Sequence, residues 1–244
     1  MIITHCIIIE TFVWCLYHHI PPQASYRAFI SGRLIALYKL LGVFPVVFRG
    51  NWWRIFAKCV LRVTGSEATN GCQDDQLCAS LKAIIYGSIH GVQDIWDNKP
   101  ATTYWIFLLV DAKTLFNEIN QIGMLWTFRH LWPSGACFVF NCYCHWSSPV
   151  LRNGNRTASF MHSRVGVMQV AYGIGVLPLI KCLKAAYTNV TRPWYEDDAD
   201  ALGTFNNIGL YFNLLKKISQ GSGYYPKPSK SVPIVHPDNL ATGK

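Results

Sequence analysis

The sequence predicts a protein of mixed helices and strands, and three patterns indicate this class. Apolar residues recur at three- and four-residue steps over residues 76–96, which is the period of an amphipathic helix. Residues 105–110 form an unbroken apolar run that is too short for a helix, so it predicts a strand buried on both faces. Asn153 and Gly154 are typical of the tight turn of a hairpin, here over residues 150–160.

Composition narrows the class of protein further. The chain has 244 residues, of which 51% are hydrophobic, so it can bury a large core. An aromatic content of 14% excludes a disordered chain. No apolar run reaches the roughly 18–20 residues that span a bilayer, which excludes a polytopic membrane protein. The formal net charge of +9 favours a polyanionic partner, either nucleic acid or a membrane surface.

Residues 1–22 are an apolar leader. They have the apolar body of a signal peptide, but Glu10 interrupts it, and both a positive start and a small-residue cleavage site are missing. We therefore expect an intracellular protein, without a distinction between nucleus and cytoplasm. Zinc sites usually need two separated pairs of ligands, and the sequence has no second pair to complement Cys137, Cys142 and Cys144. We therefore interpret these cysteines as small apolar residues of a buried helix rather than as zinc ligands.

A basic and aromatic segment follows at residues 26–58. Gly42 and Pro45 interrupt it, so short strands and turns are predicted rather than one helix. Its cations alternate with Trp52 and Trp53. These cations are Arg27, Arg33, Lys39, Arg49, Arg54 and Lys58.

The second half of the chain is predicted to contain several helices and one more strand. Pro133 breaks the chain between two of the helices, and we expect Trp126 and Trp132 to lie in the core. Helices are predicted around residues 116–125, 138–146, 170–187 and 206–218, an acidic turn at residues 195–198, and a last strand at residues 231–235.

Three carboxylates stand where a strand or a turn ends. Asp111 follows the apolar run, and Asp197 and Asp198 lie in the acidic turn. Aspartates gathered at strand ends can hold two Mg²⁺ ions about 3.5–4 Å apart, an arrangement that activates an attacking hydroxyl and stabilises a leaving oxygen. Two ordinary interpretations stay open, because a strand-end aspartate is often a helix cap and an Asp-Asp pair is often solvated.

Four segments occur in the same order as the motifs of one known family and at nearly the same spacing. They are residues 39–57, 108–120 (LLVDAKTLFNEIN), 194–199 (WYEDDA) and 223–231 (GYYPKPSKS). They resemble, in turn, the basic fingers segment, the first palm motif, the Tyr-x-Asp-Asp turn and the lysine-bearing palm segment of reverse transcriptases. The resemblance is closest to polymerase domains of non-long-terminal-repeat retroelements, and it runs from about Tyr26 to the C-terminus.

The resemblance implies an α+β right-hand polymerase. Its palm would be an antiparallel sheet with packed helices, and fingers would precede it, while the family's thumb would lie beyond Lys244. The implied division is a leader at 1–22, a fingers-like region at 23–100 and a palm-like region at 101–244. The implied reaction is template-directed addition of deoxynucleotides from their triphosphates to the 3′-hydroxyl of a primer. The partners would be an RNA or DNA template with its primer, and the cofactor two Mg²⁺ ions, with Mn²⁺ as the alternative.

The resemblance also implies roles for single residues. Asp111 and Asp197 would be the main metal ligands, with Asp198 supporting them, and Phe116 would be the steric gate against a ribose 2′-hydroxyl. Gln169 would lie near the template–nucleotide pair. The other implied nucleotide contacts are Lys39, Lys230 and Tyr195, and the implied nucleic-acid contacts are Arg49, Arg54 and Lys58.

Departures from the family pattern predict weak or absent catalysis. About six residues that usually follow Gln169 are missing, which would shorten a helix by about 9 Å. Glu196 adds a carboxylate beside the nucleotide, and Phe44 replaces an expected arginine. Two alternatives therefore stay open: a pseudo-polymerase that binds nucleic acid without catalysis, and a secreted or membrane-attached protein whose acidic turn is incidental.

Overall fold

The computed structural model describes most of the chain and divides it into two compact units. One unit comprises residues 1–67 and 128–167, and the other comprises 68–127 and 168–244. Each unit is discontinuous in sequence, whereas the division implied by the family resemblance is linear. The described residues are 2–22, 31–39, 42–49, 51–79, 84–99, 103–112, 118–144, 150–153, 156–159 and 169–236.

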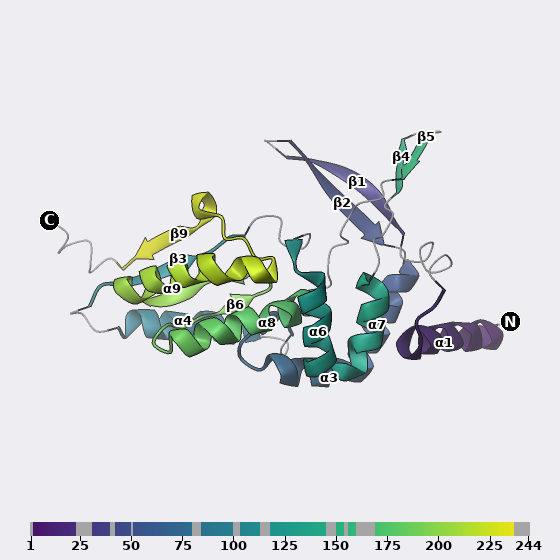
Figure 1. Cartoon of the computed structure of the whole chain (residues 1–244), viewed down its shortest axis with the longest axis horizontal. Helices are drawn as coiled ribbons and strands as arrows, with labels where there is room; N and C mark the ends of the chain where they lie inside the picture. Colours follow the sequence, from purple (N-terminus) through teal and green to yellow (C-terminus); the bar gives the residue numbers. More distant parts are fainter. Residues whose placement is uncertain are drawn as a thin grey trace. The chain divides into compact units, whose positions relative to one another are not determined.

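The first unit contains a four-stranded sheet of order β2-β1-β4-β5 (Figure 1). β1 (Gly32–Lys39) and β2 (Gly42–Arg49) pair antiparallel, with Lys39 opposite Gly42. β4 (Val150–Asn153) pairs parallel to β1 and antiparallel to β5 (Arg156–Ser159), so the structure contains the hairpin predicted at residues 150–160.

The strands predicted for the basic segment end at Arg49, and the prediction for residues 51–58 was wrong. These residues begin α3 (Asn51–Cys72). Trp53, Phe56 and Val60 are buried along one face of this helix, while Arg54 and Lys58 are exposed. The apolar residues thus follow a helical period, and Gly42 and Pro45 interrupt only the strands before it.

The apolar leader is a helix of this unit, α1 (Ile2–His18), and it packs against α7 (Pro133–Tyr143). The Nδ2 of buried Asn141 donates hydrogen bonds of 2.8 Å to the backbone oxygens of Leu16 and His19, near the C-terminal end of α1. Carbonyls at a helix end have no partner within the helix, so Asn141 satisfies groups that burial would otherwise leave unpaired. No helix of the described residues is both long and apolar enough to cross a bilayer.

The cysteines and tryptophans that were predicted to be buried differ in their solvent exposure. Cys142 is buried in α7, while Cys137 and Cys144 are only partly buried. Trp132 is fully buried, and its Nε1 donates a 3.0 Å hydrogen bond to Oγ1 of Thr64. Trp126 in α6 (Gln121–Leu131) is 61% exposed, so its assignment to the core was wrong.

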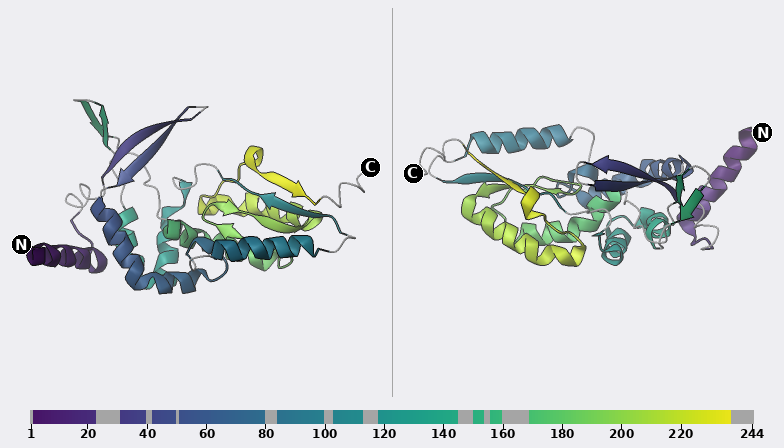
Figure 2. Two further views of the ribbon diagram at one scale, coloured as in Figure 1. Left: turned by 180° about the vertical axis from the view of Figure 1, so that it is seen from behind. Right: turned by 90° about the horizontal axis from the view of Figure 1, so that it is seen from above.

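The second unit is built on the sheet β8-β3-β9, in which both pairings are antiparallel. On β3 (Trp105–Leu109), Phe107 lies opposite Leu202 of β8 (Ala201–Thr204) and Ile234 of β9 (Val232–Val235). α8 (Gln169–Ala186) and α9 (Phe205–Ile218) lie on one side of this sheet and α4 (Ile84–Asp97) on the other (Figure 2).

Burial alternates along β3, which corrects the prediction of a strand buried on both faces. Ile106 and Leu108 are buried, whereas Trp105, Phe107 and Leu109 are only partly buried. Alternation of this kind is typical of an antiparallel sheet with one closed face. The helix predicted over residues 76–96 is present as a 3-10 turn at Leu77–Ala79 and as α4 from Ile84, and residues 80–83 lie outside the described part.

Candidate active site

Asp111 lies just beyond the central strand of the second unit. The backbone oxygen of Asp111 accepts a 2.8 Å hydrogen bond from the N–H of Lys227, and Ala112 forms an antiparallel bridge with Pro226. The segment before β9 therefore continues the pairing past the end of β3. This pairing fixes the backbone that carries the Asp111 carboxylate.

Asp197 and Asp198 lie on a very short hairpin next to this strand end. β6 (Trp194–Tyr195) pairs with β7 (Asp198–Ala199), and Glu196 and Asp197 form the two-residue loop between them. The hydroxyl of the buried Tyr224 donates a 3.0 Å hydrogen bond to the backbone oxygen of Asp197.

Val110 connects the hairpin to β3. Its backbone oxygen accepts a 3.4 Å hydrogen bond from the N–H of Ala199, and its own N–H donates a 3.4 Å bond to Oδ1 of Asp200. The residue before Asp111 is thus hydrogen-bonded to Ala199 and Asp200, the two residues that follow Asp198. The structure brings Asp111, Asp197 and Asp198 to the same end of the sheet.

The electrostatics of these side chains reflect burial and mutual repulsion. Burial raises the pKa of the Asp197 carboxyl, and the negative charge of Asp111 raises it further. Burial likewise raises the pKa of Asp198, with smaller effects of the same sign from Asp197 and Asp111. Burial and the charge of Asp197 raise the pKa of Glu196. Like charges close together disfavour ionisation, so the site favours an added cation.

One cation already lies at this site. The Nζ of Lys230 is 2.7 Å from Oδ2 of Asp111, and a short 3-10 turn, Pro228–Lys230, places the lysine there. Within the described residues, no set of three His, Cys, Asp or Glu side chains is arranged to hold a single metal ion.

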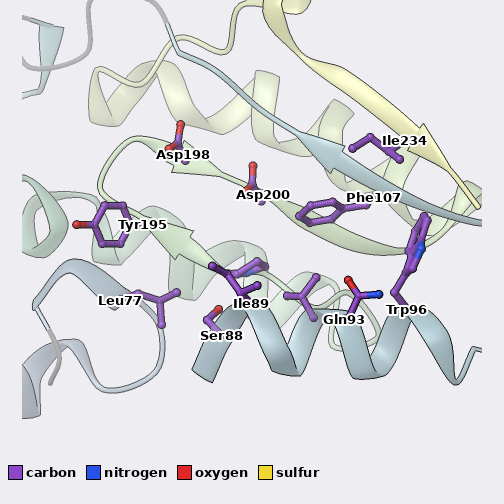
Figure 3. Close-up of a pocket in the computed structure, with 12 residues that line it drawn as sticks. Leu77, Ser88, Ile89, Gln93, Trp96, Phe107, Tyr195, Asp198, Asp200 and Ile234 are labelled. Carbon is purple, nitrogen blue, oxygen red and sulfur yellow. The ribbon is translucent and has the colours of Figure 1, made fainter. Parts of the chain in front are cut away.

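A cavity of about 500 Å³ lies beside the acidic hairpin (Figure 3). One wall consists of α4 side chains, among them Ile89, Gln93 and Trp96. Phe107 of β3 and Ile234 of β9 add apolar surface, while Tyr195, Asp198 and Asp200 line it from the hairpin and the residue that follows. Phe107 is only partly buried because it faces this cavity.

The remaining predicted site residues lie elsewhere or beyond the described parts. Phe116 falls in residues 113–117, which are outside the described residues. Gln169 begins α8, and Lys39 and Arg49 end β1 and β2, but their side chains are not among those described. Arg54 and Lys58 are exposed on α3 in the other unit.

Three residues of the site were missed by sequence reasoning. Asp200 is two positions after Asp198, so strand alternation could have indicated that both lie on the same side. Tyr224 lies within the recognised segment 223–231, but its buried hydroxyl contact is not evident from sequence. Gln76 contacts the backbone of Glu196, and no local pattern signals a contact across 120 positions.

Comparison with known proteins identifies a similar fold but assigns the sequence to no family. No protein-family model matches the chain, and no curated protein matches it. Among solved structures, the chain is similar to telomerase from Candida tropicalis in complex with a TWJ fragment of telomeric RNA, with a TM-score of 0.66 and 11% identity over 86% of this chain and 41% of that one. The chain has a telomerase-like fold.

Two further telomerase structures support the likeness. Apo telomerase from Candida tropicalis, truncated from its C-terminal domain, gives a TM-score of 0.62 at 12% identity, over 86% of this chain and 51% of that one. Telomerase from Candida albicans in complex with a TWJ fragment of telomeric RNA gives 0.61 at 10% identity, over 89% of this chain and 45% of that one. The chain therefore spans about half or less of these structures, which belong to a polymerase related to reverse transcriptases.

Proposed function

We propose that this chain is a reverse transcriptase domain of the non-long-terminal-repeat retrotransposon type, with weak or no polymerase activity. The observation that carries the proposal is the placement of Asp111 next to the Asp197–Asp198 hairpin in a telomerase-like fold. The two motifs are far apart in the sequence and meet through the backbone bond between Val110 and Ala199. The chain would then contain the palm and the fingers of a right-hand polymerase of that family.

The carboxylates supply the type of ligand that the metal of such a reaction prefers. Asp111, Asp197 and Asp198 would hold two Mg²⁺ ions through hard oxygen ligands, as that cation prefers. When bound, these ions supply activation of the primer hydroxyl and stabilisation of the leaving oxygen. Burial is the main cause of the raised pKa values of Asp197 and Asp198, and repulsion between the carboxylates adds to it. A divalent ion would offset that repulsion, which supports this assignment.

Other residues of the chain would handle the nucleotide and the nucleic acid. Lys230 would leave Asp111 to face the triphosphate, and Tyr195 would lie beside the base or sugar. Arg54, Lys58 and Arg62 are exposed at four-residue steps on α3, so they form one cationic stripe along that helix. Phosphate contacts dominate nucleic-acid affinity, and this stripe supports binding of a template–primer backbone.

Primer extension with Mg²⁺ or Mn²⁺ tests the proposed reaction. We expect incorporation by the unmodified chain to be at or below background, because misplacement of about 1 Å can cost a hundredfold in rate. Insertion of Gly-Asp-Pro-Leu-Ala-Met after Gln169, together with Glu196→Ala, should restore measurable incorporation. That rescue should disappear when Asp197→Asn is added. Robust extension by the unmodified chain, abolished by Asp197→Asn, would show that the residues missing after Gln169 matter little for catalysis.

A second candidate function is nucleic-acid binding without catalysis. The ion pair of Lys230 with Asp111 favours it, because a lysine then occupies the carboxylate that a metal ion would need. Salt-dependent binding of a template–primer duplex, with no extension even by the repaired chain, would select this candidate. Absence of binding would exclude both.

A further inference from the structure

Gln76 makes an unusual pair of contacts with the acidic hairpin. Its side chain is fully buried, and its carboxamide lies against the backbone of a single residue, Glu196. The N–H of Glu196 donates a 2.9 Å hydrogen bond to Oε1 of Gln76, and Nε2 of Gln76 donates a 3.2 Å bond to the oxygen of Glu196. Glu196 lies in the hairpin loop, where neither group is part of the β6–β7 pairing.

The backbone of Glu196 is the part of the hairpin that needs support. Its φ is +53°, in the left-handed region, which is unfavourable for a residue with a Cβ atom. Two-residue hairpin loops prefer Gly, Asn or Asp at such a position. The two hydrogen bonds between Gln76 and Glu196 stabilise this conformation, and the amide adds no charge next to Glu196, Asp197 and Asp198.

The surroundings of Gln76 hold it in place. A Cβ atom at Gly173 of α8 would lie 2.7 Å from Cγ of Gln76 and 2.5 Å from Sγ of Cys78, so only glycine permits this close approach. The preceding residue, Asp75, is buried and forms a 2.5 Å ion pair with Lys184 of α8. Residues 75 and 76 are therefore fixed against α8 on one side and against the hairpin on the other.

We propose that Gln76 is a positioning residue for the acidic hairpin. It holds Glu196 in the left-handed conformation and thereby directs Asp197 and Asp198 toward Asp111. The inference rests on the proposed function, since the consequence of correct positioning is the binding of divalent cations by these carboxylates.

Two readouts test the role of Gln76 in the full chain. Gln76→Met keeps the volume and removes both hydrogen bonds. We expect hydrogen exchange of the Glu196 amide to become at least tenfold faster. The amide of Leu202, which is bonded to the oxygen of Thr191, should exchange as before and serves as the internal control. Mn²⁺ affinity, measured from the electron paramagnetic resonance of free Mn²⁺, should fall at least tenfold.

The decisive comparison repeats Gln76→Met in a chain that carries Glu196→Gly. Glycine adopts the left-handed conformation without strain, so the loss of Mn²⁺ affinity caused by Gln76→Met should shrink to less than threefold. If the Gln76→Met chain folds only when Glu196→Gly is also present, that rescue of folding would also support the proposal. A loss that Glu196→Gly does not reduce, a chain unfolded in both backgrounds, or unchanged exchange at Glu196 would overturn it.

The outcome for the proposed function can be read separately. The proposed function would be overturned if the unmodified chain bound no Mn²⁺, or if its Mn²⁺ affinity did not depend on Asp197. The exchange rate of the Glu196 amide would still decide whether Gln76 positions the hairpin.

Discussion

Lys230 and Asp111 form an ion pair, with 2.7 Å between Nζ and Oδ2. Both side chains are partly exposed, at 56% and 35%, so solvent screens the pair and its contribution to stability is small. Its importance lies in its position, because Asp111 is one of three carboxylates at the end of the central sheet. In the proposed function, a divalent cation and the lysine ammonium compete for the same carboxylate.

Replacement of Lys230 should therefore strengthen cation binding. We expect Lys230→Gln to increase Mn²⁺ affinity about two- to fivefold, which corresponds to an exposed ion pair of about 0.5–1 kcal/mol. Lys227→Gln is the matched control, because it removes the same charge from an exposed side chain three positions away. Equal effects of the two changes would mean that only the overall charge matters and that the ion pair doesn't compete with the metal.

Asp200 should make the stability of the chain depend on pH. Burial raises the pKa of its carboxyl to about 6. An unfolded chain has a value of about 4, so the folded state holds the proton more tightly and the free energy of unfolding falls as pH rises from about 4 to about 6. Asp200→Asn should thus raise the free energy of unfolding by about 1–2 kcal/mol at pH 7.5 and much less at pH 4. Urea unfolding at the two pH values measures this, and equal gains at both would contradict it.

Gly223 should be intolerant of any side chain. Its φ is +75°, and a Cβ atom there would lie 2.0 Å from the backbone oxygen of Glu118 and 2.7 Å from the nitrogen of Asn120. Backbone atoms cannot yield as a flexible side chain can, so Gly223→Ala should lower the free energy of unfolding by about 3 kcal/mol or more.

Gly221→Ala is the control for this change, since no atom lies within 4 Å of the added Cβ. It should alter the free energy of unfolding by less than about 0.5 kcal/mol. Urea unfolding curves of the two variants, recorded side by side, would show the difference. A Gly223→Ala chain as stable as Gly221→Ala would mean that the backbone of residues 118–120 lies elsewhere.

The cationic stripe of α3 should determine how nucleic-acid binding responds to salt. We expect replacement of Arg54, Lys58 and Arg62 by alanine to reduce the slope of log affinity against log salt by about one unit for each lost phosphate contact. Fluorescence anisotropy with a labelled template–primer duplex at several NaCl concentrations measures the slope. Lys216→Ala with Lys217→Ala removes exposed charge from α9 and should leave the slope nearly unchanged. Equal slopes for both variants would place the nucleic-acid contact outside the stripe.

Local sequence patterns determined much of this fold. The unbroken apolar run and the residue after it predict β3 with Asp111 beyond its end, because a short run of β-forming residues has few other conformations. The acidic turn, the hairpin at residues 150–160 and the helix at residues 206–218 are likewise present where short-range patterns place them. Each depends on residues within a few positions of one another.

The tertiary structure decided how these elements are used. β3 has one closed face and one face on a cavity, Trp126 is exposed, and residues 51–58 are helical because their apolar side chains have a core to pack against. The acidic hairpin is held by Gln76, which is 120 positions away in the sequence. A contact of this kind has no local signature, because the energy that selects it is gained only when α8 and the sheet bring the two segments together.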